Sequence, residues 1–290
     1  MKLKNFIYLD KDKMYSISSQ MFEGIAQELL KEETLENQDS ETQGGPILSG
    51  KVLADVVKNT TKSTEKKFLH DYSFTLFEKE LNDKQIILDI SDLNQQEISE
   101  KIESFSFIKI TKEVTFNDHL KLQDFFSKFN QFGTAISRMI IFGDKQALEG
   151  LGKQRKDQYI KEKESELHQD PKFLESFVLL SKQGFNDNFE VSQTVDSLLI
   201  TSYLNRDYLR ESENILIRKY SRKTNVKVSV IGTVSQYLMS NNATPKEDFD
   251  GDLSAHMRNM FEHLASVEYS ISGKSDNEIV IDPIAAYIEL

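Results

Sequence analysis

The sequence contains no cysteine among its 290 residues. This absence excludes disulfide bonds, thiolate nucleophiles and cysteine-ligated zinc sites. Long apolar runs are also missing. No stretch approaches the roughly 18 uninterrupted apolar residues of a membrane span, and the apolar run after Met1 is too short for a signal peptide. We therefore expect a cytoplasmic protein that is not associated with a membrane.

Positive charge is in short supply, with 36 Lys and Arg residues against 47 Asp and Glu residues and a formal net charge of -11. Such a molecule repels phosphate backbones, so nucleic acid is not an expected partner unless a local basic surface overcomes the net charge. Hydrophobic residues make up 38% of the chain and include 19 Phe, which is enough for folded cores. The length favours two domains.

The first predicted elements are an apolar strand over residues 6–9 and an amphipathic helix that follows it. Asp12 stands where a side-chain oxygen would cap this helix. Apolar residues then recur at four-residue steps from Ile17 to Leu29, which predicts that one helix face packs into a core. Residues 32–50 are acidic, polar and contain Gly and Pro, which predicts a mobile loop.

Strands and helices alternate in the rest of the predicted N-terminal domain. A helical period begins at Thr64, and residues 86–90 read as a buried strand. Asn94 and Glu97 give a capping signal for the next helix, and residues 107–116 alternate as a strand or hairpin. Asn117 is expected to cap a helix with apolar residues at the i, i+3, i+4 and i+7 positions, namely Leu122, Phe125, Phe126 and Phe129. We predict an α+β domain over residues 1–144.

A charged stretch separates this domain from the rest of the chain. Residues 145–169 have few apolar positions and place Lys153, Asp157 and Lys161 at i, i+4 steps, as in a solvated helix. Asp170 and Pro171 then end one helix and start another. We predict a helical connector over residues 145–190.

The remaining residues, 191–290, indicate a C-terminal α+β domain. We expect strands over 197–204, 226–234, 267–272 and 278–281, and helices over 207–220 and about 253–265. This β-α-β-α-β-β order predicts a small antiparallel or mixed sheet with helices on one face, loosely ferredoxin-like.

A first strand that ends in Tyr8, Leu9 and Asp10 is followed by a Tyr-Ser pair at 15–16 and a Ser-Gln pair at 19–20. These residues carry a resemblance to a bacterial family of unassigned activity, a domain of unknown function. It continues through residues 107–110, 117–118 and 230–234 to the Pro-Ile-Ala-Ala-Tyr ending at 283–287. Because the family has no assigned activity, the resemblance implies no chemistry for this chain.

Four carboxylates crowd residues 247–252, where Asp248, Asp250 and Asp252 are candidate ligands for a divalent metal. The segment does not fit a calcium EF-hand loop, because Leu253 stands where the obligatory Gly should be. Its Asp-Phe-Asp-Gly-Asp string resembles the metal-binding signature of multisubunit RNA polymerases over a handful of residues. The alternative, in which no cofactor is bound, is an acidic loop that caps the helix beginning near Leu253.

Five basic residues gather at a predicted helix end and in the turn after it: Arg218, Lys219, Arg222, Lys223 and Lys227. They indicate either an anion or phosphate site or a solvated helix end whose cations offset the helix dipole. Another candidate group, for a ligand or an interface, lies near the first strand-helix junction: Tyr8, Asp10, Tyr15 and Gln20. A Tyr packed against a capped helix is the structural alternative there.

We expect a protein without chemistry of its own, a regulatory or defence-related component that acts through a protein partner or as a homo-oligomer. One alternative is a metal-dependent phosphodiesterase or nuclease that uses the 247–252 carboxylates and holds phosphate at the basic turn. A third hypothesis is a sensor that binds a nucleotide or other small anion near residues 218–227. The sequence leaves the choice between these open.

Overall fold

The computed structural model describes residues 3–21, 63–143, 149, 152–237, 260, 263–264, 266–271, 273 and 275–290. Contacts divide the chain into two units. Unit 1 comprises Met1–Phe116, Val191–Met239 and Asp276–Leu290, and unit 2 comprises Asn117–Glu190 and Ser240–Ser275. Each unit is described by itself below. None of the described helices combines the length and the apolar content needed to cross a membrane.

Unit 1 is built on one mixed sheet, whose described strands are β1 (Lys4–Leu9), β2 (Ile87–Asp89), β3 (Phe107–Asp118), β4 (Phe189–Val195), β5 (Leu198–Leu204), β6 (Lys223–Gln236) and β7 (Glu278–Glu289). The strand order is β1-β7-β5-β4-β3-β2, and β6 pairs with both β3 and β7. Strands β3, β4, β5, β7 and β6 therefore form a closed five-stranded ring, with β1 and β2 attached to it. The prediction of an α+β fold is confirmed.

The closure of the ring depends on two long strands, β6 and β7. They pair antiparallel with register shifts between Ile231 and Gly232 and between Val234 and Gln236. Such bulges bend a strand and increase its twist, which lets a small sheet curl onto itself. Gly232 lies opposite Pro283, where a Cβ atom would come within 2.3 Å of the Asp282 carbonyl oxygen. The sequence therefore needs glycine at this close approach.

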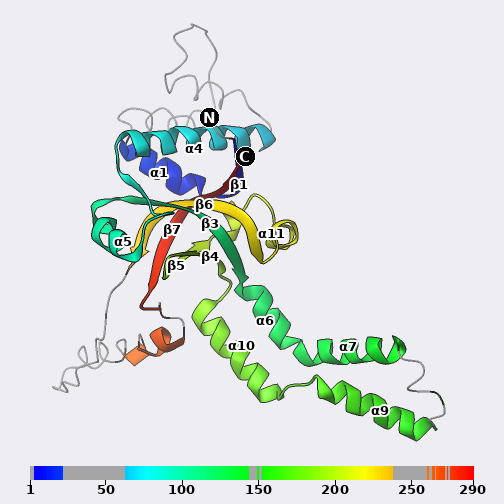
Figure 1. Cartoon of the computed structure of the whole chain (residues 1–290). Helices are drawn as coiled ribbons and strands as arrows, with labels where there is room; N and C mark the ends of the chain where they lie inside the picture. Colours follow the sequence, from blue (N-terminus) through cyan, green and yellow to red (C-terminus); the bar gives the residue numbers. More distant parts are fainter. Residues whose placement is uncertain are drawn as a thin grey trace, which may run out of the picture. The chain divides into compact units, whose positions relative to one another are not determined.

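The helices of unit 1 are α1 (Lys11–Met21), α4 (Ser63–Asp83), α5 (Gln95–Lys101) and α11 (Glu213–Tyr220), with 3-10 turns η1 (Ile102–Ser104) and η2 (Arg206–Tyr208). Helices α1 and α4 lie side by side next to β1 (Figure 1). Aromatic rings fill the space between them and the sheet, and Phe6 meets Phe74 edge to face at 5.3 Å between centroids. The cluster also contains Leu9, Met14, Phe77, Leu81, Phe107, Ile231, Ile284, Ala285 and Tyr287.

The caps of three helices compare directly with the sequence-based predictions. The capping box of Asn94 and Glu97 at α5 is confirmed, with both reciprocal hydrogen bonds present. The cap predicted at Asp12 is wrong, because α1 already begins at Lys11 and Asp10 accepts from the Lys13 amide at 2.9 Å. The cap predicted at Asn117 is wrong by one residue, because β3 continues to Asp118, whose side chain caps the next helix.

Unit 2 is helical, with α6 (His119–Ser127), α7 (Phe129–Gly143), α9 (Lys153–Glu166) and α10 (Pro171–Phe185). Helix α10 packs beside α6, and α9 packs beside α7 (Figure 1). As predicted, Asp170 and Pro171 start a helix, and the Asp170 carboxylate accepts from the Phe173 amide at 2.9 Å. The strand predicted over 267–272 is wrong, because residues 266–271 are helical. The spacing of Leu264, Val267 and Ile271 continues a helical stripe.

The strands predicted for the N-terminal and C-terminal domains belong to a single sheet. Strand β3 pairs with β6 from Ile108 to Thr115, so the predicted boundaries at 144 and 191 separate parts of one sheet. The strands after residue 191 do not form the small separate sheet expected for a ferredoxin-like domain, because β1 and β3 pair with them. Long-range pairing of this kind leaves no signal in local periodicity.

Candidate functional site

The residues predicted near the first strand-helix junction hold that junction together. Tyr8 is buried, and burial raises the pKa of its phenol. Asp10 caps α1 and also lies 3.5 Å from the Lys13 ammonium. The Tyr15 hydroxyl shares a hydrogen bond of 2.7 Å with His70 Nδ1 of α4, and Gln20 donates to the Ser16 carbonyl of its own helix. The junction thus joins α1 to β1 and α4.

The five basic residues lie together at the end of α11 and the start of β6, and all of them are exposed. Acidic side chains lie next to two of them. Lys219 forms an ion pair with Glu211, and Lys227 lies opposite Glu113 in the register of β3 and β6. The structure thus brings the basic residues together and gives them acidic neighbours from other parts of the chain.

The predicted metal ligands Asp248, Asp250 and Asp252 and the predicted mobile loop at 32–50 lie outside the described residues. Within the described part of the chain, no three Asp, Glu or His side chains are grouped closely enough to hold a metal ion.

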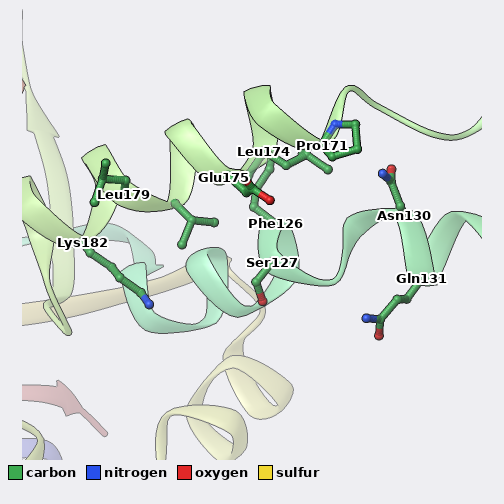
Figure 2. A pocket seen from close by; sticks show the side chains of 10 residues that line it. Phe126, Ser127, Asn130, Gln131, Pro171, Leu174, Glu175, Leu179 and Lys182 are labelled. Carbon is green, nitrogen blue, oxygen red and sulfur yellow. The ribbon is translucent and has the colours of Figure 1, made fainter.

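An open groove of about 450 Å³ runs between α10 and the junction of α6 with α7 in unit 2 (Figure 2). Apolar side chains of both elements line it, among them Phe126, Leu174 and Leu179. Glu175 and Lys182 supply one charge of each sign. The lining of the groove suits an apolar side chain.

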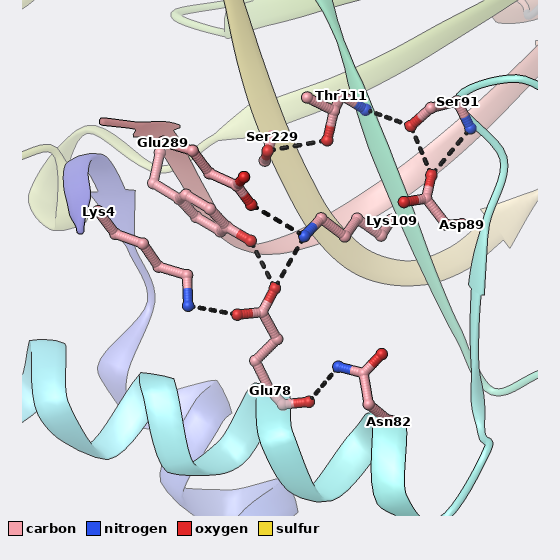
Figure 3. Close-up of polar contacts among 10 residues, drawn as sticks. Lys4, Glu78, Asn82, Asp89, Ser91, Lys109, Thr111, Ser229 and Glu289 are labelled. Atoms are coloured by element: carbon pink, nitrogen blue, oxygen red, sulfur yellow. Dashed lines mark hydrogen bonds and ion pairs between the residues drawn. The ribbon is translucent and has the colours of Figure 1, made fainter. Parts of the chain in front are cut away.

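A network of buried charges ties α4 to the sheet of unit 1 (Figure 3). The Glu78 carboxylate of α4 forms ion pairs with Lys4 of β1 and, at 3.0 Å, with Lys109 of β3. Tyr287 of β7 donates to the same carboxylate at 2.6 Å. Lys109 is also 3.3 Å from Glu289. Three strands and one helix are thus held by a single carboxylate.

Neighbouring groups determine the protonation states of Glu78 and Tyr287 in this network. Burial alone would raise the pKa of Glu78, but the hydrogen bonds from Lys4 and Tyr287 and the charge of Lys109 outweigh burial and hold that pKa below its ordinary value. Burial, and then the adjacent Glu78 carboxylate, raise the pKa of Tyr287. A carboxylate that is charged and a phenol that is protonated near neutral pH are suited to holding structure and poorly suited to proton transfer at that pH.

Helix α7 packs against α9 through its small and polar side chains. A Cβ atom on Gly133 would lie 3.0 Å from the Leu167 carbonyl oxygen, so the two chains approach closely there. Ser137 donates to the Lys163 carbonyl at 2.9 Å, and Arg138 donates to the Glu164 carboxylate at 2.7 Å. Thr134 hydrogen-bonds His168 at 2.9 Å. Polar contacts, a glycine and the buried Ile141 therefore occupy the side on which a helix of a bundle usually places a continuous apolar stripe.

Apart from Ile141, which is buried, and Phe129, which is half-buried, the large apolar side chains of α7 are exposed to solvent. The exposed fractions are 41% for Phe132, 50% for Ile136, 76% for Met139, 60% for Ile140 and 79% for Phe142. These five residues form the α7 apolar face. It contains no charged or titratable side chain, so it has the chemistry of a binding surface that works by burial.

The apolar stripe predicted for this region ended at Phe129. A usable signal lay further on, because Phe132, Ile136, Met139 and Gly143 follow one another at steps of four, three and four residues. Gly133 and Ser137 mark a second face of small residues on the same helix. Two faces of different size on one helix predict two packing partners.

A family model described as "Domain of unknown function (DUF6414)" matches residues 3–287 of the chain. No curated protein and no solved structure matches it.

Proposed function

This chain belongs to that family of unknown function, and from this premise we propose that it is a protein-interaction component whose contact surface is the α7 apolar face. The partner element is an amphipathic α-helix. The observation that carries the proposal is the packing of α7, which buries Gly133, Ser137 and Ile141 and leaves the five large side chains of the α7 apolar face exposed.

The shape of the face supports a helical ligand. Helix α7 is 15 residues long, and its exposed positions follow the 3.5-residue repeat of helices that pack side by side. A helix laid along this repeat covers the whole stripe and satisfies its own backbone hydrogen bonds. An extended peptide would find no strand edge on α7 with which to pair.

The energetics also favour a covered face. An exposed apolar patch of several hundred Å² is rare on a monomer and marks a contact site. The hydrogen bonds of Ser137 and Arg138 fix the other side of α7 to α9. Turning the helix to bury its apolar face against α9 would break these bonds and bring large side chains into the space at Gly133. The face is therefore presented by a fixed support.

Site-specific photo-crosslinking tests the proposal. A photoreactive amino acid replaces Met139 on the apolar face or, as a control, Asp157, which is exposed on α9. We expect a polypeptide adduct from position 139 whose linked residue maps to an apolar stripe of a helix, in another copy of this chain or in another protein. The control position should give no such adduct. Equal labelling from the two positions, or an adduct at 139 that contains no polypeptide, would contradict the proposal.

A further inference from the structure

The α7 apolar face is complementary to itself. We propose that it binds the same face of a second copy of this chain, with the two α7 helices antiparallel around a twofold axis that passes between residues 137 and 138. This inference rests on the proposed function and names its partner. Together with the two α9 helices, the pair would form a four-helix bundle.

The complementarity follows from the size of the side chains along the helix. Antiparallel pairing around this axis sets Ile136 against Met139 of the second copy. It also sets Phe132 against Gly143 and Ile140 against Ala135 of the second copy. Phe132 and Ile140 thus each meet a small residue, which lets the helices approach and fill the space between them. A parallel pair in register would place Phe132 on Phe132 and Gly143 on Gly143, which crowds one end and leaves a void at the other.

The charges permit the same arrangement. From Phe132 to Gly143 the sequence contains a single charged residue, Arg138, and its guanidinium donates to Glu164 of α9 on the opposite side of α7. No ion would lose its water when two α7 faces meet. Outside the pair, α9 carries the charged surface, with Lys153, Asp157 and Lys161 on a helix that has no buried residue. The bundle would be apolar inside and charged outside.

The area is sufficient for a specific dimer. A fully exposed large side chain presents about 200 Å². With the exposed fractions given above, the five side chains of one face present on the order of 600 Å², so a pair would bury about 1,200 Å², the lower end of specific interfaces.

Sedimentation velocity of the full chain between about 1 and 100 μM tests the proposal. We expect a monomer-dimer equilibrium that Ile136→Asp shifts by about 30-fold or more, because the dimer would bury an unpaired carboxylate. Leu180→Asp is the matched control, because Leu180 is exposed on α10 to 51% and Ile136 to 50%. The control should leave the equilibrium unchanged. Should Ile136→Asp lower the thermal midpoint, Met139→Lys at a more exposed position serves as the second variant.

Cysteine crosslinking tests the orientation, because the natural chain has no cysteine. A mixture of Phe132→Cys and Gly143→Cys proteins should form a mixed disulfide dimer. Phe132→Cys alone should not, because antiparallel pairing separates the two copies of residue 132 by about 16 Å along the axis. Efficient crosslinking of Phe132→Cys with itself would refute the antiparallel pair.

Three other results would overturn self-pairing. One is a monomer at 100 μM. Another is a dimer that neither Ile136→Asp nor Met139→Lys weakens. The third is a monomer that floats with vesicles of phosphatidylcholine and phosphatidylglycerol through the α7 apolar face. The photo-crosslinking experiment distinguishes the two proposals, because an adduct from position 139 to a helix of another protein keeps the proposed function and rejects the second copy, whereas an adduct within the same copy rejects both.

Discussion

Replacement of Glu78 by alanine should destabilise unit 1 strongly. The side chains of Glu78, Lys4 and Lys109 are exposed by only 10%, 12% and 19%, so the carboxylate and its two cations are largely withdrawn from water. Removing one partner of a buried ion pair typically costs about 3–5 kcal/mol, because the remaining charge is left unpaired. Lys109 keeps Glu289 as a partner, which places the expected loss near the lower end, at about 3 kcal/mol.

The measurement is urea unfolding followed by tyrosine fluorescence. The chain has no Trp, and all its tyrosines except Tyr159 and Tyr269 belong to unit 1, so this signal reports mainly on the sheet unit. Glu80→Ala is the matched control on the same helix, where an exposed i, i+4 pair with Lys84 is worth less than about 1 kcal/mol. Tyr287→Phe should fall between them, with a loss of about 1.5–3 kcal/mol. A Glu78→Ala protein within about 1 kcal/mol of the control would refute the reasoning that the network holds α4 to the sheet.

Two further predictions concern the sheet and acid stability. Gly232→Ala should destabilise the protein by about 1–3 kcal/mol in the same urea assay, because the new methyl group meets the Asp282 carbonyl oxygen; an unchanged midpoint would contradict the close approach. Glu78 and Glu190 have lowered pKa values in the folded protein. Their contribution to its stability is therefore complete above the unfolded pKa of about 4.3 and is lost as the pH falls through the folded pKa values. The thermal midpoint should therefore decrease as the pH is lowered below about 4.3, and this decrease should be less steep in the Glu78→Gln protein than in the unmodified protein.

Local sequence signals predicted the elements whose determinants lie within a few residues. The capping box of Asn94 and Glu97 and the start of α10 at Pro171 are of this kind, because a cap is decided by a side chain and an amide three residues apart. The first strand and the charged helix α9 also follow from local composition.

The arrangement of the sheet depended on information that no local window contains. Strand β7, near the end of the chain, pairs with β1 at its start, and β3 pairs with β6 more than a hundred residues away. The buried network shows the same limit, because Lys4, Glu78 and Tyr287 come from three distant segments. No spacing rule connects such residues.

The α7 apolar face was missed for a different reason. A helical stripe of large apolar residues normally indicates the side that packs into the core. In α7 the packed side is instead the one with Gly133 and Ser137, where the backbone of the neighbouring segment comes close. The sequence contained both stripes, but periodicity alone does not say which one the fold buries.

The accessibility of a cysteine at position 139 tests the central claim most directly. Met139→Cys and Asp157→Cys each provide the only thiol of the full chain, and their rates of reaction with a maleimide are compared at low and high protein concentration. If the α7 apolar face is covered by a second copy, the thiol at 139 should react at least about tenfold more slowly once nine-tenths of the protein is paired, and should recover on dilution. The thiol at 157 should react at one rate throughout. Equal rates for the two positions at every concentration would contradict the account.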